Sequence, residues 1–143
     1  MEAPLSDVTP MRPLPEPGEL TRPFWEGAAR GALLHPRCDD CGQAFFPPHV
    51  VCQKCRSAGW SWVESAGRGT VYSFTVVHRA PQPGFDPPYV LAVVDLDERL
   101  ELMTNLVGVN PDDVRIGQRV RVEWRSFGDI TLPMFTPDEE APR

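Results

Sequence analysis

Alternating apolar and polar side chains mark the second half of the chain as β-structure. Val120, Val122 and Trp124 fall on one face of the segment 119–125 and charged residues on the other, as in a strand with one solvated side. Neighbouring segments are rich in β-branched and aromatic residues, which favour strands, and turn-forming residues separate them. The expected strands lie at residues 69–79, 89–96, 100–107, 119–125 and 131–135.

One helical turn is expected between the third and fourth of these strands. Asn110 precedes the segment 111–114, Pro-Asp-Asp-Val, which is typical of a capped turn, and Gly117 can end it. Five strands with the only helical element in this position match the five-stranded Greek-key barrel called the OB-fold. The fold class that we expect is therefore mainly β, with an OB-fold barrel over residues 67–136.

A short helix is expected ahead of the barrel, over residues 21 to about 30. Thr21 can cap its start, and Pro23 suits its first turn. One face carries two apolar pairs at i, i+4 spacing, formed by Phe24, Trp25, Ala28 and Ala29. This face either packs on the chain's own ribbon or docks on another subunit, so Phe24 and Trp25 are candidate partner contacts.

The four cysteines of the chain form two C-x-x-C pairs, Cys38 with Cys41 and Cys52 with Cys55, separated by ten residues. Two residues between ligands let one tight turn direct both thiolates at the same ion, and two such turns complete a tetrahedron. Closed Cys₄ sites favour zinc, whereas a redox dithiol, the alternative, is usually a single motif at a helix start. We expect one structural zinc ion that stabilises a segment too small to fold alone.

Composition and charge restrict the classes of function. The chain has 143 residues, 41% of them hydrophobic, and a formal net charge of -6, so it repels polyanions at long range. It has neither an apolar run that could cross a bilayer nor the features of a signal peptide, and we expect a cytoplasmic protein. The expected divisions are a proline-rich arm (1–20), a helix and zinc ribbon (21–66), the barrel (67–136) and an acidic tail (137–143).

No catalytic constellation is evident in the sequence. It contains no G-x-S-x-G elbow, no glycine-rich phosphate loop, and no cysteine left as a nucleophile once zinc takes four. His78 and Arg79, beside the proline-rich loop, form a cationic pair that can meet a phosphate or a carboxylate, or that can simply be solvated at a strand end. We therefore expect no catalytic residues in this chain.

The sequence resembles the zinc-ribbon plus OB-fold proteins called domain of unknown function 35 (DUF35). The resemblance covers about residues 20–136, nearly the whole expected ordered chain. The residues that carry it lie at 23–27, 37–42, 46–48, 52–55, 69–77, 87–96 and 105–108.

The resemblance implies a non-catalytic accessory or scaffold subunit of an acyl-CoA-processing complex. Proteins of this family are similar to obligate partners of thiolase-fold enzymes or hot-dog-fold hydratases, for example in steroid side-chain degradation, and the catalytic residues belong mainly to the partner. The implied partner is a thiolase-like aldolase, lyase or acyltransferase in a hetero-oligomer. A CoA thioester would be contacted within that complex, and the candidate residues are His78, Arg79 and Tyr89.

Two other functions stay open at this point. OB-folds and zinc ribbons commonly bind single-stranded nucleic acid, but residues 67–136 hold seven Arg against nine acidic residues, and such binding needs a basic groove. An enzyme that acts on CoA esters alone would require a base or nucleophile that the sequence does not offer. We expect an enzyme partner and neither a nucleic-acid nor a membrane partner.

Overall fold

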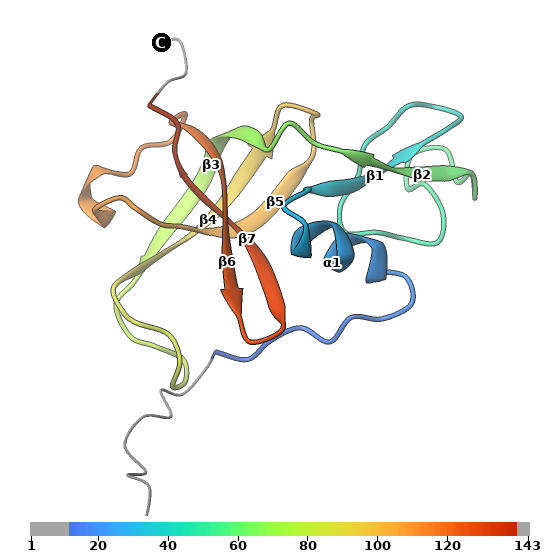
Figure 1. Ribbon diagram of the computed structural model, residues 1–143. Helices are drawn as coiled ribbons and strands as arrows, with labels where there is room; N and C mark the ends of the chain where they lie inside the picture. The colour runs from blue at the N-terminus through green and yellow to red at the C-terminus, as the bar shows by residue number, and fades with distance from the viewer. Residues whose placement is uncertain (1–11, 140–143) are drawn as a thin grey trace, which may run out of the picture.

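A closed barrel of five strands makes up the larger part of the computed structural model, which describes residues 12–139 (Figure 1). The strands are β3 (Arg68–Val77), β4 (Tyr89–Leu96), β5 (Glu101–Leu106), β6 (Arg119–Phe127) and β7 (Ile130–Pro137). Around the barrel they follow the order β3-β4-β5-β7-β6, and the β5–β7 pair is parallel. This is the Greek-key arrangement of the OB-fold, so the predicted fold is confirmed.

The barrel interior is filled by side chains that alternate along each strand. On β4, Val90, Ala92, Val94 and Leu96 are buried, and the residues between them are half-buried. Phe135 of β7 belongs to the same core and has no exposed surface. Since successive side chains of a strand point to opposite faces, one face of β4 enters the core and the other is only partly covered.

The helical turn predicted between the third and fourth barrel strands is confirmed as a short 3₁₀ helix, η2 (Pro111–Asp113). The side-chain oxygen of Asn110 accepts a hydrogen bond from the backbone N–H of Asp112 at 3.0 Å, as an N-cap residue does. Val114, directly after the turn, is buried in the barrel core. The turn is therefore fixed at both ends.

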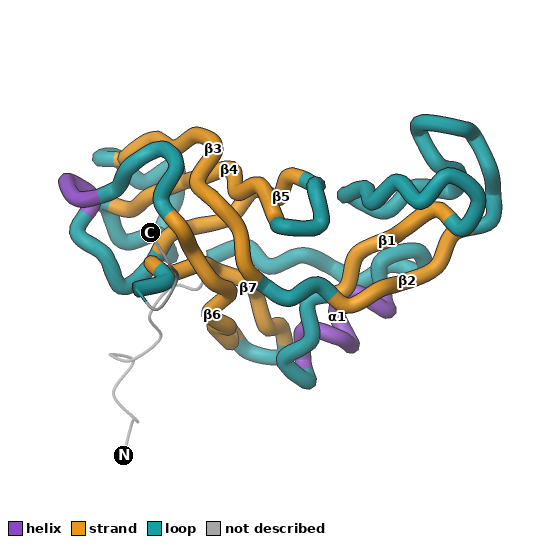
Figure 2. Tube along the Cα trace, turned by 90° about the horizontal axis from the view of Figure 1, so that it is seen from above, coloured by secondary structure: helices purple, strands orange, loops and turns teal. Residues whose placement is uncertain are grey.

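A two-stranded ribbon precedes the barrel and extends to one side of it (Figure 2). Its strands, β1 (Leu34–Cys38) and β2 (Trp60–Glu64), pair antiparallel. β2 was not predicted, because it is five residues long and no residue in it is fully buried. The long loop between the two strands carries three of the four cysteines.

Helix α1 (Arg22–Ala29) packs between the ribbon and β7 (Figures 1 and 2). Pro23 lies in its first turn, as predicted. Thr21 occupies the N-cap position, but the predicted side-chain cap is wrong, because its hydroxyl accepts the backbone N–H of Gly18 at 3.0 Å instead. Within residues 12–139 no helix is long and apolar enough to cross a membrane.

A hydrogen-bond cluster joins the ribbon to the barrel. The hydroxyl of Ser65 donates to Oε1 of Glu98 at 2.5 Å, and the backbone N–H of Ala66 donates to Oε2 at 3.0 Å. The Ser65 hydroxyl also accepts the N–H of Gly67 at 2.9 Å. The carboxylate of Glu98, in the β4–β5 hairpin, therefore holds the segment through which the chain passes from ribbon to barrel.

Residues 12–20 run along the barrel to α1 without a regular helix or strand (Figure 1). A guanidinium nitrogen of Arg12 donates to Oδ1 of Asn105 at 3.2 Å. The Cζ atom of Arg12 lies 4.7 Å from the ring centre of Phe85 and 5.4 Å from that of Phe127. Residues 1–11 of the expected arm and residues 140–143 of the expected acidic tail lie outside the described residues.

An ion pair between Asp97 and Arg119 links the β4–β5 hairpin to β6, with contacts of 2.7 and 2.9 Å. The hydrogen bond from Arg119 is the main cause that lowers the pKa of Asp97 below its ordinary value of 3.8. The pair therefore stabilises the fold above that value, and the stabilisation is lost as the pH falls through the lowered pKa. Both side chains are more than a third exposed, so the effect is small.

We expect Asp97→Asn to lower the free energy of unfolding by roughly 0.5 kcal/mol at neutral pH. The difference from wild type should vanish at a pH well below 3.8, because both chains then lack the charge. Urea denaturation at the two pH values measures this, and Asp129→Asn, in the exposed β6–β7 hairpin, is the control. A difference that persists in acid would show that the charge is not its cause.

Candidate metal centre and adjoining groove

The four cysteines converge at the end of the ribbon, where their sulfur atoms all lie within 4.8 Å of one another. Cys38 is the last residue of β1, and its Sγ lies 3.5 Å from that of Cys55. The Sγ atoms of Cys41 and Cys52 are 3.7 Å apart. Four thiolates about 2.3 Å from a zinc ion would be about 3.8 Å apart in a tetrahedron. The four residues therefore fit a tetrahedral zinc ion.

Both C-x-x-C turns are closed by a backbone hydrogen bond from the residue that follows the pair. The N–H of Gly42 donates to the carbonyl of Cys38 at 3.0 Å, and the N–H of Arg56 to that of Cys52 at 2.8 Å. Both donors have left-handed backbones, with φ of 76° and 65°. The N–H of Lys54 points at Sγ of Cys52 from 3.4 Å, a contact that favours the thiolate.

The electrostatics of the site favour deprotonation of Cys52. Its pKa is lowered to about 7, mainly by the hydrogen bond from the backbone N–H of Cys55 and against the opposing effect of burial. Zinc binds thiolates and releases protons when it does so. The low pKa of Cys52 therefore lowers the cost of deprotonating that ligand, whereas the pKa of Cys55, despite the backbone N–H of Ser57, is raised to about 12 by its hydrogen bonds with the other thiols.

The ribbon has very little core besides the cysteines. Cys38, Cys52 and Phe45 are its buried cluster, and Trp60 packs on Phe45 edge to face at 5.8 Å. His49 stacks on Phe45 and pairs with a side-chain amide, and it is not part of the ligand cluster found in the described residues. With four thiolates around the ion no open coordination position remains, so the arrangement supports a structural metal and not a catalytic one.

The structure separates the three residues that were predicted to contact CoA. His78 and Arg79 follow the end of β3 and are solvent-exposed. Tyr89, the first residue of β4, is half-buried and stacks on Phe85 at 5.6 Å. Tyr89 lines a cavity of about 240 Å³ with Phe85 and Phe127, and neither His78 nor Arg79 lines it.

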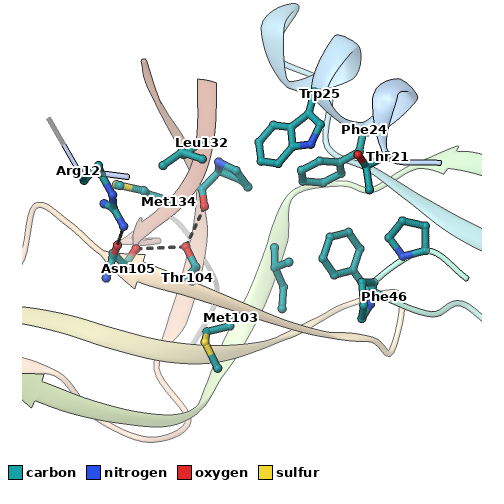
Figure 3. Close-up of a pocket in the computed structure, with 14 residues that line it drawn as sticks. Arg12, Thr21, Phe24, Trp25, Phe46, Met103, Thr104, Asn105, Leu132 and Met134 are labelled. Atoms are coloured by element: carbon teal, nitrogen blue, oxygen red, sulfur yellow. Dashed lines mark hydrogen bonds between the residues drawn. The ribbon is translucent and has the colours of Figure 1, made fainter. Parts of the chain in front are cut away.

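The two predicted partner contacts differ in how much surface they present. Phe24 is 4% exposed and packs on Phe46 at 5.2 Å, so it mainly anchors α1 to its own chain. Trp25 is half-buried, touches Phe24 edge to face at 4.9 Å, and faces a groove (Figure 3). Of the two, Trp25 is the one with surface available to another molecule.

This groove, of about 300 Å³, lies between α1, the loop 46–48, β5 and β7 (Figure 3). Its lining is mostly apolar, with Arg12 and Asn105 together at one end and Phe24 and Phe46 at the other. The groove was not predicted, because segments far apart in the sequence form it. The apolar face of α1 was the one signal that pointed to it.

Comparison with known proteins assigns both parts of the chain. Residues 25–61 match the family model described as "ChsH2, rubredoxin-like zinc ribbon domain", and residues 62–125 match "ChsH2, C-terminal OB-fold domain". A "DUF35 domain-containing scaffold protein" of Methanocaldococcus jannaschii is 36% identical over 99 residues, which are 67% of this chain and 70% of that protein.

Two further similarities concern proteins of acyl-CoA metabolism or aldolases. A "Probable enoyl-CoA hydratase alpha subunit" of Thermomonospora curvata is 44% identical over 80% of this chain, which spans only 36% of that relative. A solved structure described as "Ltp2-ChsH2(DUF35) aldolase" contains a chain with 40% identity and a TM-score of 0.80. That match covers 87% of this chain and 98% of the other.

Proposed function

Because the chain belongs to the ChsH2 (DUF35) family of zinc-ribbon and OB-fold proteins, we propose that it is a non-catalytic accessory subunit of an acyl-CoA-processing enzyme complex. One observation carries this proposal. The chain has the same fold, at a TM-score of 0.80, as nearly the whole of one chain in an aldolase whose description names both ChsH2 and DUF35.

The partner that we propose is a thiolase-fold enzyme, an aldolase, lyase or acyltransferase of steroid or other lipid side-chain degradation, in a hetero-oligomer with this chain. The aldolase match supports this choice. A hydratase is the second candidate partner, because the chain is 44% identical to part of a probable enoyl-CoA hydratase alpha subunit. Either partner would supply the catalytic residues.

In this proposal Cys38, Cys41, Cys52 and Cys55 hold one structural zinc ion, whose part is to keep the ribbon folded. The support is the close approach of the four sulfur atoms and the small aromatic core beside them. A zinc held by four thiolates supplies no Lewis-acid chemistry, because water and substrate have no position at the ion. The ribbon then acts as a rigid surface beside α1 and the barrel.

His78, Arg79 and Tyr89 remain our proposed contacts to CoA within the complex. The side chains of His78 and Arg79 are exposed at the start of the loop between β3 and β4, where their N–H groups could donate hydrogen bonds to phosphate groups. Trp25 is the proposed partner contact on α1, whereas the burial of Phe24 limits it to supporting that surface.

The experiment that tests the accessory role is an activity assay after co-expression with the thiolase-fold enzyme of the same organism. We expect a stable complex by size-exclusion chromatography with light scattering, and acyl-CoA turnover that the enzyme alone does not reach. The purified chain alone should be inactive. Turnover of an acyl-CoA by the chain alone, or an enzyme that is equally stable and active without it, would refute the proposal.

A further inference from the structure

The groove beside α1 combines an apolar lining with a single charge. Its apolar walls include Trp25, Phe46, Leu102, Met103, Leu132 and Met134. None of its described lining residues carries a carboxylate, and Arg12 is the one charged residue among them. Figure 3 shows the guanidinium of Arg12 beside Asn105, away from the aromatic end of the groove.

At the Arg12 end of the groove, the polar side chains of Thr104 and Asn105 already have partners within the chain. The Thr104 hydroxyl donates to the carbonyl of Pro133 at 2.8 Å, and the amide of Asn105 donates to the carbonyl of Val90 at 3.0 Å. Oδ1 of Asn105 accepts the hydrogen bond from Arg12. A ligand would therefore find apolar walls and, at one end, the remaining N–H donors of a guanidinium.

Arg12 is held in place by two aromatic rings. Phe85, from the loop between β3 and β4, and Phe127, at the end of β6, lie against its guanidinium at 4.7 and 5.4 Å. This packing fixes the side chain, so an anion that binds it does not have to order it first. Burial lowers the pKa of Arg12 from its ordinary value, because the guanidinium has lost part of its water and no carboxylate of residues 12–139 offsets that loss.

The size of the groove limits what it can hold. A volume of about 300 Å³ is near the lower end of the range for small-molecule sites. At about 30 Å³ for each water-sized group, it accommodates about ten non-hydrogen atoms. An unbranched carboxylate of about eight carbons has that size.

We propose that this groove binds a medium-chain carboxylate, with its hydrocarbon chain against Trp25, Leu102 and Leu132 and its carboxylate on Arg12. The charge of the site selects the occupant. A planar guanidinium that pairs with no carboxylate of residues 12–139 matches a carboxylate ligand, and apolar walls match an alkyl chain. The proposal does not depend on the accessory role of the chain, because every residue it uses belongs to this chain.

Sodium octanoate is the probe, and octan-1-ol and octylamine are its neutral and cationic counterparts. In isothermal titration and ¹⁵N NMR of the full chain, we expect octanoate to bind more tightly than either analogue and to shift the Trp25 indole and the amides of Met103 and Thr104. Arg12→Gln should weaken octanoate binding by about tenfold and leave octan-1-ol unaffected, since one charge-assisted contact is lost. Arg121→Gln, an exposed arginine on β6, should change neither.

A second variant tests the apolar part of the site. Leu132→Trp fills the groove from β7 and should abolish binding of both octanoate and octan-1-ol, with an NMR spectrum that remains that of a folded chain. The proposal is wrong if octanoate gives no saturable binding up to about 10 mM. It is also wrong if Arg12→Gln binds octanoate as tightly as wild type does. A Leu132→Trp chain that loses its complex with an enzyme but still binds octanoate would contradict it as well. In each of these cases the accessory role would still stand.

Discussion

Replacement of Cys52 by serine is expected to remove the zinc ion and unfold the ribbon. Cys52 is fully buried, and its sulfur lies 3.7 Å from that of Cys41. A serine hydroxyl is a poor ligand for zinc at neutral pH, and a structural zinc site contributes its binding free energy to folding. Because the ribbon's own core is so small, we expect it to lose at least about 3 kcal/mol of stability.

Mass spectrometry of the zinc content measures the loss of the ion. The near-ultraviolet circular dichroism of Trp60 and Trp62 measures the unfolding of the ribbon. Gln53→Ser is the matched control, because Gln53 lies exposed in the same C-x-x-C turn and its amide pairs only with His49 among the described side chains. It should keep the ion and change stability by no more than about 0.5 kcal/mol. A Cys52→Ser chain that retained its zinc and its unfolding midpoint would contradict the assignment.

Replacement of Gly69 by alanine should destabilise the barrel by about 3 kcal/mol, at the upper end of the cost of overpacking a core. Gly69 pairs with Leu96 of β4 on one side and with Val120 of β6 on the other, so it lies where the barrel closes. A Cβ atom there would be 2.3 Å from the carbonyl oxygen of Asp95. A backbone oxygen cannot move aside as a side chain can, so the strands would have to separate.

Urea denaturation followed by tryptophan fluorescence measures this cost. Gly18→Ala is the control, because the nearest atom to its added methyl group is the Thr21 hydroxyl at 4.0 Å. We expect a change within about 0.5 kcal/mol for the control. If Gly69→Ala and Gly18→Ala had the same free energy of unfolding, the strands at Gly69 would have made room for the methyl group without cost, and the prediction would be wrong.

The features that the sequence predicted well are those that depend on neighbouring residues. β4 begins and ends where predicted, at Tyr89 and Leu96, because a run rich in β-branched residues favours a strand and turn-forming residues bound it on both sides. The spacing of the cysteine pairs likewise encodes a local turn, and the structure brings the two turns together. Local chemistry thus accounts for the fold class and for the metal-ligand cluster.

Features that depend on contacts between residues far apart in the chain could not be predicted from the sequence. The apolar face of α1 left open whether Phe24 packs internally or on a partner, and only the position of Phe46 decides it. The Arg12 site draws on Asn105, Phe85 and Phe127, which lie more than 70 residues away in the sequence. β2 is specified mainly by its pairing with β1, so five residues without a buried side chain gave too little signal.

The central claim is that this chain serves an acyl-CoA enzyme as an accessory subunit. The most direct test is a pull-down of the tagged chain from its native lysate, washed at moderate salt, with mass-spectrometric identification of what stays bound. We predict recovery of a thiolase-fold enzyme near a one-to-one ratio. Recovery of nucleic acid, or of no enzyme, would contradict the claim and favour an independent OB-fold binding module.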